Sequence, residues 1–305
     1  MARAEWIDLL DPDEPELRAR MSKRLHTRAL TRLLEPAEHK GEPRPTLESH
    51  GDYVFGVFLV PVAVPGENHV YYQEVDLVLT RELVLTVRKT PPRGEPFDTK
   101  DVRETCTRGD VEDPGMVAYH LVDDVAEDYL ELIDALNDKI DELDDHVEEW
   151  PAERVRGRIS ELRHDLLHIR RTLAPTRDAI RRIVDGRIEL DGQELFPHEV
   201  ELHFADAYDK LLRASEGLDF SRDLLTGVRD YSQAKIANDQ NDVVKRLTAA
   251  ASLLLVPTFI VGVYGQNFIR SMPELRWAFG YEWSWGWIIA TTIAQIVYFR
   301  RKGWL

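Results

Sequence analysis

Two uncharged stretches near the end of the chain dominate its pattern of hydrophobic and polar positions. The first runs from Leu247 to Tyr264 and the second from Trp283 to Phe299. Each is near the lower length limit for a helix that crosses a hydrocarbon layer of roughly 30 Å. The link between them, residues 265–282, is short and polar. The pattern therefore predicts two membrane helices joined by an external loop.

Basic and aromatic residues at the ends of these stretches predict their orientation. Lys245 and Arg246 precede the first stretch, and the basic tail, residues 300–305, follows the second. Basic residues beside membrane spans stay in the cytoplasm, so we expect both chain ends there, in a multi-pass protein of the cell membrane. The basic outer flanks disfavour the alternative, a buried helical hairpin inside a soluble domain. Aromatic residues typical of a membrane interface lie near the span ends: Tyr281, Trp283, Trp285, Trp287, Tyr298 and Trp304.

Helical character extends far upstream of the first uncharged stretch. Beyond Pro197, no residue pattern ends a helix before Gly265. Residues 197–264 therefore predict one long stalk helix, which starts in the cytoplasm and continues into the membrane as the span 247–264.

The N-terminal part, residues 1–112, predicts a cytosolic α/β domain. Alternating aromatic and β-branched residues predict strands, and charged segments with scattered leucines predict one or two short helices. Strands that follow closely in sequence favour an antiparallel or mixed sheet. The strands are expected at residues 5–10, 53–64, 70–80 and 83–88, and the helices within residues 13–35.

Residues 113–196 predict two amphipathic helices of opposite charge. Asp113 and Pro114 are typical of a helix start, with a capping carboxylate and a proline at the first position. One face of this helix is apolar and the other almost entirely acidic, and Pro151 ends it. The next helix is rich in arginine, so an antiparallel hairpin is expected. The acidic face is either a solvated, charge-paired surface or a means of concentrating cations near an ion path.

Composition excludes several classes of function. The net charge of −16 leaves no basic surface for nucleic acid. Cys106 is the single cysteine, which rules out an internal disulfide and is typical of a reducing compartment. The sequence contains no nucleophile motif, phosphate-binding loop or dinucleotide-binding glycine pattern, so an enzyme is not expected. The N-terminus has no apolar leader, so the first membrane span is expected to direct insertion.

Two histidines on the basic helix raise the question of a metal site. His164 and His168 are four residues apart, the spacing of a two-ligand clamp. The surrounding arginines and the lack of an evident third ligand favour a structural or surface role.

One face of the long helix is suited to line an ion path. A two-helix hairpin cannot enclose a pore alone, so several copies must surround an axis. A face without charge cannot strip water from a small divalent ion, but it can pass an ion that keeps its water, and Mg²⁺ dehydrates reluctantly. The alternative is that small residues only permit close helix packing in lipid. Polar, small or apolar residues at helical spacing form this face: Asn241, Val244, Thr248, Ala251, Leu255, Thr258 and Gly262.

Several short motifs stand out along the chain. Those of the C-terminal part are YGQNF (Tyr264–Phe268), MPEL (Met272–Leu275), Gly280-Tyr281 and YFRRKGWL (Tyr298–Leu305), those of the long helix are FADAYDK (Phe204–Lys210) and NDVVKRLT (Asn241–Thr248), and the N-terminal half has PRPTLESHGDYVF (Pro43–Phe55). Together they resemble the motifs of the CorA family of divalent-cation channels, most specifically in the C-terminal part and more weakly in the N-terminal half.

The resemblance implies a funnel-shaped homopentamer, in which an α+β cytosolic domain is followed by a long stalk helix and a two-helix transmembrane hairpin. It implies that a Gly-Met-Asn loop captures hydrated Mg²⁺ outside the membrane. Asn267 matches the ion-selecting asparagine, and Gly265 the glycine that permits its tight turn. Asp206 matches a stalk aspartate that binds regulatory Mg²⁺ between subunits, and Asp230 is a second acidic position. Pore roles carry over as follows: Asn241 as an inner polar ring, Val244 and Leu247 as an apolar constriction, and Leu255 and Thr258 as span lining.

The chain departs from the family pattern at three points. Gln266 stands in place of methionine in the loop motif, and Glu274 is the remaining acid of the loop. Ile269 and Arg270 stand where an acid is expected. The partner acid of the stalk aspartate has no clean match, and Glu35 or Glu38 is nearest. These departures bear on ion identity and on gating by internal Mg²⁺.

The leading hypothesis is passive transport of hydrated Mg²⁺, with Co²⁺ and Ni²⁺ as further ions, through a homopentamer in the lipid bilayer. Mg²⁺ would then be both substrate and regulatory ligand. Two alternatives stay open, namely a Zn²⁺ transporter of the same fold and a non-conducting scaffold anchored in the membrane.

Overall fold

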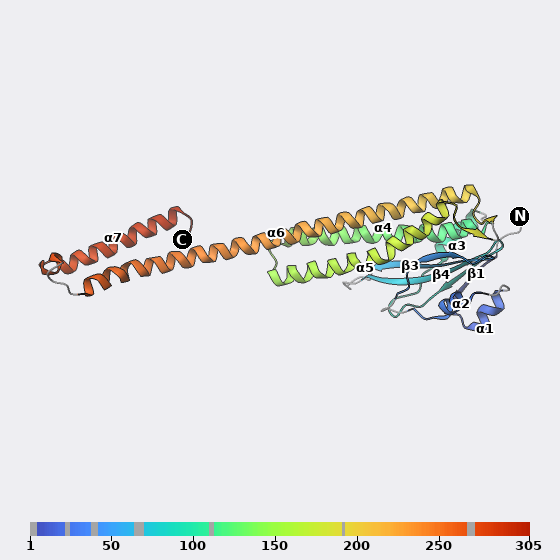
Figure 1. The fold of residues 1–305 in the computed structure, drawn as a ribbon, viewed down its shortest axis with the longest axis horizontal. Helices are drawn as coiled ribbons and strands as arrows, with labels where there is room; N and C mark the ends of the chain where they lie inside the picture. The colour runs from blue at the N-terminus through green and yellow to red at the C-terminus, as the bar shows by residue number, and fades with distance from the viewer. Residues whose placement is uncertain are drawn as a thin grey trace. The chain divides into compact units, whose positions relative to one another are not determined.

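The computed structural model describes residues 5–21, 25–37, 42–63, 70–109, 113–190, 193–266 and 272–305. It divides into two compact units, Met1–Arg229 and Asp230–Leu305. The first unit contains the predicted α/β domain, the helical hairpin and the first part of the long helix α6 (His198–Gly265), drawn in gold and orange (Figure 1). The predicted long helix is confirmed as one uninterrupted element, with Pro257 inside it.

A mixed five-stranded sheet forms the centre of the first unit. The strand order is β1-β5-β4-β3-β2, with β1 parallel to β5 and the other neighbours antiparallel. Four strands agree with the expected positions, whereas β2 was not predicted, because its four residues TLES carry one buried leucine, Leu47. The bounds are β1 Glu5–Leu10, β2 Thr46–Ser49, β3 Val54–Ala63, β4 Val70–Leu79 and β5 Leu83–Arg88.

Helices cover both faces of this sheet (Figure 1). Side chains alternate between the faces along each strand, so Val78 and Leu85 pack toward one helical layer while Leu77 and Val84 pack toward the other. The first layer holds α1 (Glu14–Arg20) and α2 (Thr27–Leu34). The second holds α3 (Lys100–Arg108), α4 (Pro114–His146), α5 (Ala152–Val184) and the start of α6.

The predicted helical hairpin is confirmed as α4 and α5. The Asp113 carboxylate caps α4 by accepting a hydrogen bond of 2.6 Å from the Gly115 N–H, and Pro151 immediately precedes α5. A short strand pair, β6 (Glu189–Leu190) and β7 (Gln193–Glu194), follows α5.

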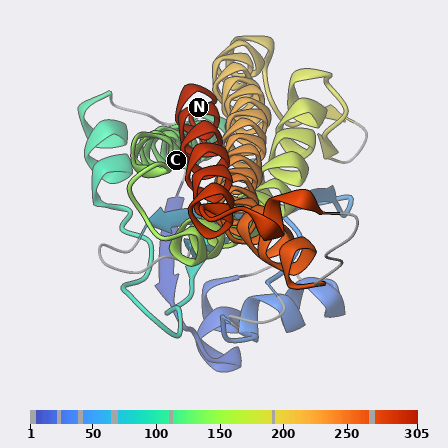
Figure 2. The same ribbon diagram turned by 90° about the vertical axis from the view of Figure 1, so that its left-hand side faces the viewer.

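Helix α6 lies between α4 and α5, which Figure 2 shows in green and yellow-green on its two flanks. A Cβ atom at Gly217 would lie 2.9 Å from Ile133 Cγ2, so glycine permits the close approach to α4. Ser221 Oγ donates to Asn137 Oδ1 of α4 at 2.6 Å. On the other flank, Arg177 of α5 donates to Ser215 Oγ at 3.2 Å.

A buried ionic cluster joins α2 to the sheet. Lys89 Nζ lies 2.6 Å from Glu74 Oε1 and 3.0 Å from Asp76 Oδ2, and it donates to the Arg32 carbonyl at 2.7 Å. The Arg32 guanidinium also contacts Glu74 Oε1 at 2.5 Å. Burial raises the pKa of Asp76, against the lowering effect of Lys89. Removing one partner would therefore leave a buried charge without compensation.

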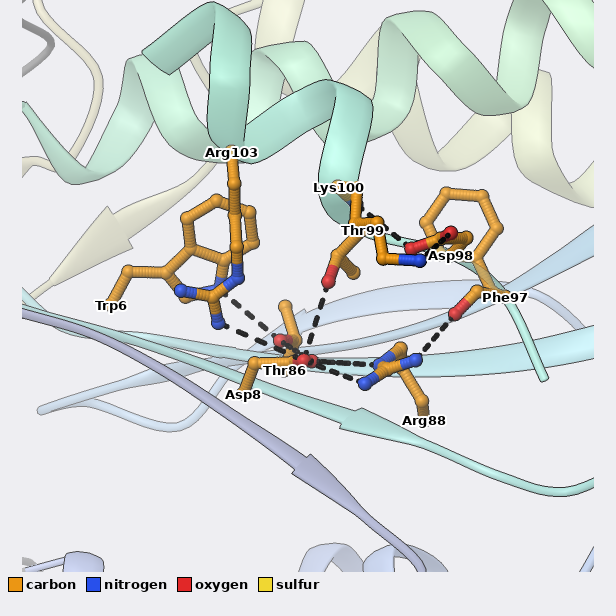
Figure 3. Close-up of polar contacts among 9 residues, drawn as sticks. All are labelled: Trp6, Asp8, Thr86, Arg88, Phe97, Asp98, Thr99, Lys100 and Arg103. Carbon is orange, nitrogen blue, oxygen red and sulfur yellow. Dashed lines mark hydrogen bonds and ion pairs between the residues drawn. The ribbon is translucent and has the colours of Figure 1, made fainter. Parts of the chain in front are cut away.

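A second polar network fixes α3 to the edge of the sheet (Figure 3). The Asp8 carboxylate of β1 accepts hydrogen bonds from Thr86 Oγ1 at 2.7 Å and from Arg88 Nε at 3.0 Å, both on β5. Thr99 Oγ1, at the start of α3, donates to the same carboxylate at 3.3 Å, and Arg103 of α3 lies 3.7 Å from it. Because Asp8 has several donors, it is paired within the fold and carries a structural role.

Candidate ion path

The second unit contains the end of α6, the short 3₁₀ helix η1 (Pro273–Arg276) and α7 (Gly280–Arg301). Gln295 Nε2 of α7 donates to the Ser252 carbonyl of α6 at 3.2 Å. The sequence analysis did not predict this contact. The signal for it is Gln295 itself, because a polar side chain inside an uncharged stretch needs a hydrogen-bond partner. The helices are confirmed, and α7 begins three residues before the expected Trp283 because Gly280–Glu282 join its first turn.

By length and composition, α6 is the one helix among the described residues that is apolar enough to span a membrane. Its most apolar window has a mean hydropathy of 1.9 and is almost entirely exposed. The mean hydropathy of α7 is too low for a candidate membrane span, because Gln295 and the tryptophans Trp283, Trp285 and Trp287 lower it. The second span therefore stays a prediction.

The eight residues predicted to line the path all lie on the exposed side of α6, which we call the pore-lining face. Residues that face α7, such as Ser252, Val256 and Ile260, are partly covered. By contrast, the side chains of Leu247 and Leu255 are more than two-thirds exposed. The whole face consists of Asn241, Val244, Leu247, Thr248, Ala251, Leu255, Thr258 and Gly262.

Two threonines give this face a defined hydrogen-bonding character. Thr248 Oγ1 donates to the Val244 carbonyl at 2.8 Å, and Thr258 Oγ1 donates to the Leu254 carbonyl at 2.7 Å. Each hydroxyl has a single proton, so both oxygens present only acceptor lone pairs to the exposed side. Water bound to a cation points its hydrogens outward. The face therefore suits the outer surface of a hydrated cation.

The loop after α6 is described only at its ends. Gly265 is the last residue of α6, and the Gln266 N–H donates to the Val263 carbonyl at 3.3 Å. Asn267 lies outside the described residues, so its predicted role is not tested. Glu274 lies in η1, and its Oε2 atom is enclosed without a hydrogen-bond partner among the described residues. Gly265 does not adopt a left-handed backbone conformation.

The two aspartates predicted to bind regulatory metal lie exposed on α6. Among the described residues, no group of three or more histidine, cysteine or acidic side chains is arranged to hold a metal ion. Glu35 follows α2, pairs with Arg32 at 2.9 Å and lies across the sheet from α6, while Glu38 lies outside the described residues. A site between Asp206 and such a partner would therefore need two chains, and the roles of Asp206 and Asp230 stay predictions.

The histidine pair on α5 is partly engaged by another residue. His168 Nε2 lies 2.7 Å from Glu42 Oε2, and the rings of His164 and His168 are 6.3 Å apart. The contact with Glu42 gives His168 a structural partner.

The acidic face of α4 is partly paired with α6. Lys210 Nζ lies 2.9 Å from Asp123 Oδ1 and 2.8 Å from Glu127 Oε2. Nearby, burial raises the pKa of Asp128 to about 7, and the negative charges of Asp124, Glu131 and Glu127 add to this effect. The fold therefore holds Asp128 where its charged form is unfavourable.

The Asp128→Asn variant is expected to stabilise the protein at pH 8 but not at pH 4. Because the folded-state pKa is raised from 3.8 to about 7, the folded state retains a proton that the unfolded state releases. The contribution of Asp128 to stability is thus full below the unfolded pKa and lost as pH rises through 7. After a discount for solvent exposure, the gain at pH 8 is about 1 kcal/mol.

Urea unfolding of the full chain at pH 4, 6 and 8 measures this effect. Asp145→Asn, at the exposed end of the same helix, controls for the loss of one negative charge. An equal gain at all three pH values would contradict the expected linkage.

Together, the α/β domain, the apolar stretch of α6 that is long enough to span a membrane and the neutral exposed face of that stretch are features expected of a membrane transporter. A family model described as CorA-like Mg²⁺ transporter protein matches residues 2–301. The chain is 30% identical to the cobalt/magnesium transport protein CorA of Thermotoga maritima over 86% of this chain and 73% of that protein. The chain therefore belongs to the CorA-like Mg²⁺ transporter family.

Further comparisons agree with this assignment. The cobalt/magnesium transport protein CorA of Methanocaldococcus jannaschii is 23% identical over 99% of this chain and 92% of its own length. The solved structure of the complete CorA magnesium transporter from that organism matches with a TM-score of 0.77 at 21% identity, covering 99% of this chain and 92% of that chain. The predicted family is thus confirmed, as is the predicted fold of an α/β domain followed by a long helix, whereas the assembly of five chains stays a prediction.

Proposed function

We propose that five copies of this chain surround an axis and let hydrated Mg²⁺ pass down its electrochemical gradient across the cell membrane. Co²⁺ and Ni²⁺, which also hold water in octahedral shells, are further cargo. The observation that carries this proposal is the pore-lining face, which is neutral, exposed and equipped with outward acceptor oxygens. In this arrangement Asn241 forms the inner polar ring, and Val244 and Leu247 form the apolar constriction above it.

In the proposed pore, the loop after α6 selects the ion on the outer side. The Asn267 amide oxygens of five chains accept hydrogen bonds from the first water shell, and Gln266 supplies the amide that replaces the family's thioether. Glu274 adds negative charge close to this entrance, which raises the local concentration of cations. The basic residues at both ends of the hairpin keep the two chain ends in the cytoplasm.

The Asn267→Ala variant is expected to lose most Mg²⁺ flux, because it removes the amide ring that positions the hydrated ion. The measurement is Mg²⁺ uptake into proteoliposomes with an internal fluorescent indicator, and protein-free liposomes give the background. The same assay with Co²⁺, Ni²⁺ and Zn²⁺ ranks the ions. Unchanged flux in the variant would contradict the proposed selection.

The zinc alternative is the less favoured one, since the named relatives carry cobalt and magnesium in their names. A Zn²⁺ flux that exceeds Mg²⁺ flux at equal ion activity would reverse this order. The scaffold alternative requires that the purified protein conduct no divalent cation under any gradient.

Asp206→Ala is expected to make flux less sensitive to Mg²⁺ inside the vesicle. Its exposed carboxylate lies on α6 and is proposed to hold a regulatory Mg²⁺ between neighbouring chains, with Asp230 as a second acidic position on the same helix. Titration of internal Mg²⁺ during uptake measures the midpoint of inhibition. Asp209→Ala, on the exposed side of the same helix, is the control, and an unaltered midpoint in Asp206→Ala would refute this role.

A further inference from the structure

An open groove with an apolar floor and an acidic rim lies between α4 and α6 in the first unit. It encloses about 390 Å³. Phe220 at its edge is 59% exposed, which is unusual for an aromatic side chain beside other apolar groups. The lining residues are Ile140, Asp141, Asp144, Phe220, Asp223 and Leu224, with Gly227 and Val228 at one end.

Two of the three acidic side chains of the rim have no ion-pair partner among the described residues. Asp223 pairs with its neighbour Arg222 at 3.3 Å. Within the parts of the chain that the structure describes, no cation pairs with Asp141 or Asp144, and both are exposed. A binding partner with an apolar side chain and positive charge would therefore cover the apolar floor of the groove and neutralise its acidic rim.

The same chain presents a surface with that chemistry on α5, which we call the basic ridge (Arg163, Leu167, Arg170 and Arg171). Leu167 is 50% exposed, and the arginines lie three or four residues from it, so all four share one helix face. Arg170 reaches Asp219 only at 4.0 Å. Among the described residues, Arg163 and Arg171 have no ion-pair partner.

The two surfaces lie on opposite flanks of α6. Gly217 and Ser221 of α6 contact α4 on the groove side, whereas Ser215 contacts Arg177 of α5 on the ridge side. Residues two apart on a helix point about 200° away from each other, which agrees with the separation of α4 and α5 in Figure 2. A chain cannot place its own ridge in its own groove, but it can place the ridge in the groove of a neighbour.

We propose that the basic ridge of one copy docks in the acidic groove of the next copy, with Leu167 against Phe220 and Arg171 beside Asp144. Such a contact joins two different surfaces and repeats from chain to chain, so it forms a ring when the rotation between copies closes. The inference rests on the proposed assembly of five chains and names the surfaces that hold its cytosolic part together.

Disulfide trapping in mixed assemblies of the full-length protein tests this contact. One tagged chain carries Leu167→Cys and a second, differently tagged chain carries Phe220→Cys, while the buried Cys106 stays in place. After oxidation we expect covalent dimers that contain both tags. Assemblies of either variant alone should give no such product. Leu202→Cys, at a leucine on α6 that is 58% exposed but outside the groove, replaces Phe220→Cys as the matched control.

Charge reversal tests the pairing of the rim and the ridge. Arg171→Asp on the first chain, or Asp144→Arg on the second, should abolish the mixed product, and both changes together should restore it. Native mass spectrometry and Mg²⁺ flux are measured on the same samples. A five-chain assembly with normal flux but no mixed product would overturn this contact and leave the proposed function standing. Absence of any five-chain assembly would remove the proposed pore as well.

Discussion

Ala251→Lys will abolish Mg²⁺ flux, whereas Ala250→Lys will leave most of it. Ala251 lies within the pore-lining face, and Ala250 is also exposed but points about 100° away from it around the helix axis. A lysine ammonium about 6 Å from a divalent ion costs roughly 5 kcal/mol at an effective dielectric constant of about 20. The cost is multiplied when every copy contributes one lysine to the same path.

The neighbouring alanine is a close control because both positions lie in the first turns of the apolar span. A lysine at either place can extend its ammonium group toward the water interface, so insertion into the membrane should be affected equally. Uptake into proteoliposomes measures the flux of both variants, and size-exclusion chromatography checks their assembly. Normal flux in Ala251→Lys, or equal loss in both variants, would show that another face lines the path.

Lys89→Met will destabilise the protein by about 3–5 kcal/mol, because it leaves two buried carboxylates without their shared cation. Glu74 and Asp76 are almost fully buried, and the Lys89 ammonium lies within 3.0 Å of both. The loss should be smaller at pH 5 than at pH 8. Burial raises the pKa of Asp76, so the carboxyl group takes up a proton in the acidic range and no longer needs a partner.

Urea unfolding of the full chain at the two pH values measures this loss. Arg18→Met is the matched control, since Arg18 forms a 2.6 Å pair with Glu14 in which both side chains are at least half exposed. An exposed pair of this kind contributes about 0.5 kcal/mol or less. Equal effects of the two variants would refute the importance of the buried cluster.

Long periodic segments made much of the fold predictable. The apolar positions of α4 and α5 recur over many turns, and Asp113 and Pro151 mark their starts, so both helices were predicted. The expected end of α4 at Pro151 was wrong, since α4 ends at His146 and a turn follows it. Helix α3 was missed because it buries only Val102 and Cys106, which is too few positions to reveal a period. The buried ionic cluster around Lys89 was not predicted. In the sequence, Glu74 and Asp76 look like solvent-facing residues of a strand, and only the fold shows that α2 covers them.

The candidate path was predictable to the extent that it depends on helical spacing. Helical spacing predicted one face for Asn241, Thr248 and Thr258, and all three are exposed in the structure. That they line an ion path stays a prediction. The acceptor character of that face was not predictable, because it depends on which backbone carbonyl takes each hydroxyl proton. The groove beside Phe220 was also missed, since it arises from the spacing between two helices that are distant in sequence.

The hydroxyl protons of Thr248 and Thr258 have a consequence for anions. Water around chloride points its oxygens outward and needs donors from a wall, but these two hydroxyls have already given their only protons to carbonyls of α6. Beside these two threonines the wall offers lone pairs but no hydroxyl proton, so it would distinguish the sign of an ion through the orientation of its water. Discrimination of this kind needs no fixed charge, so it should persist at ionic strengths that screen surface electrostatics.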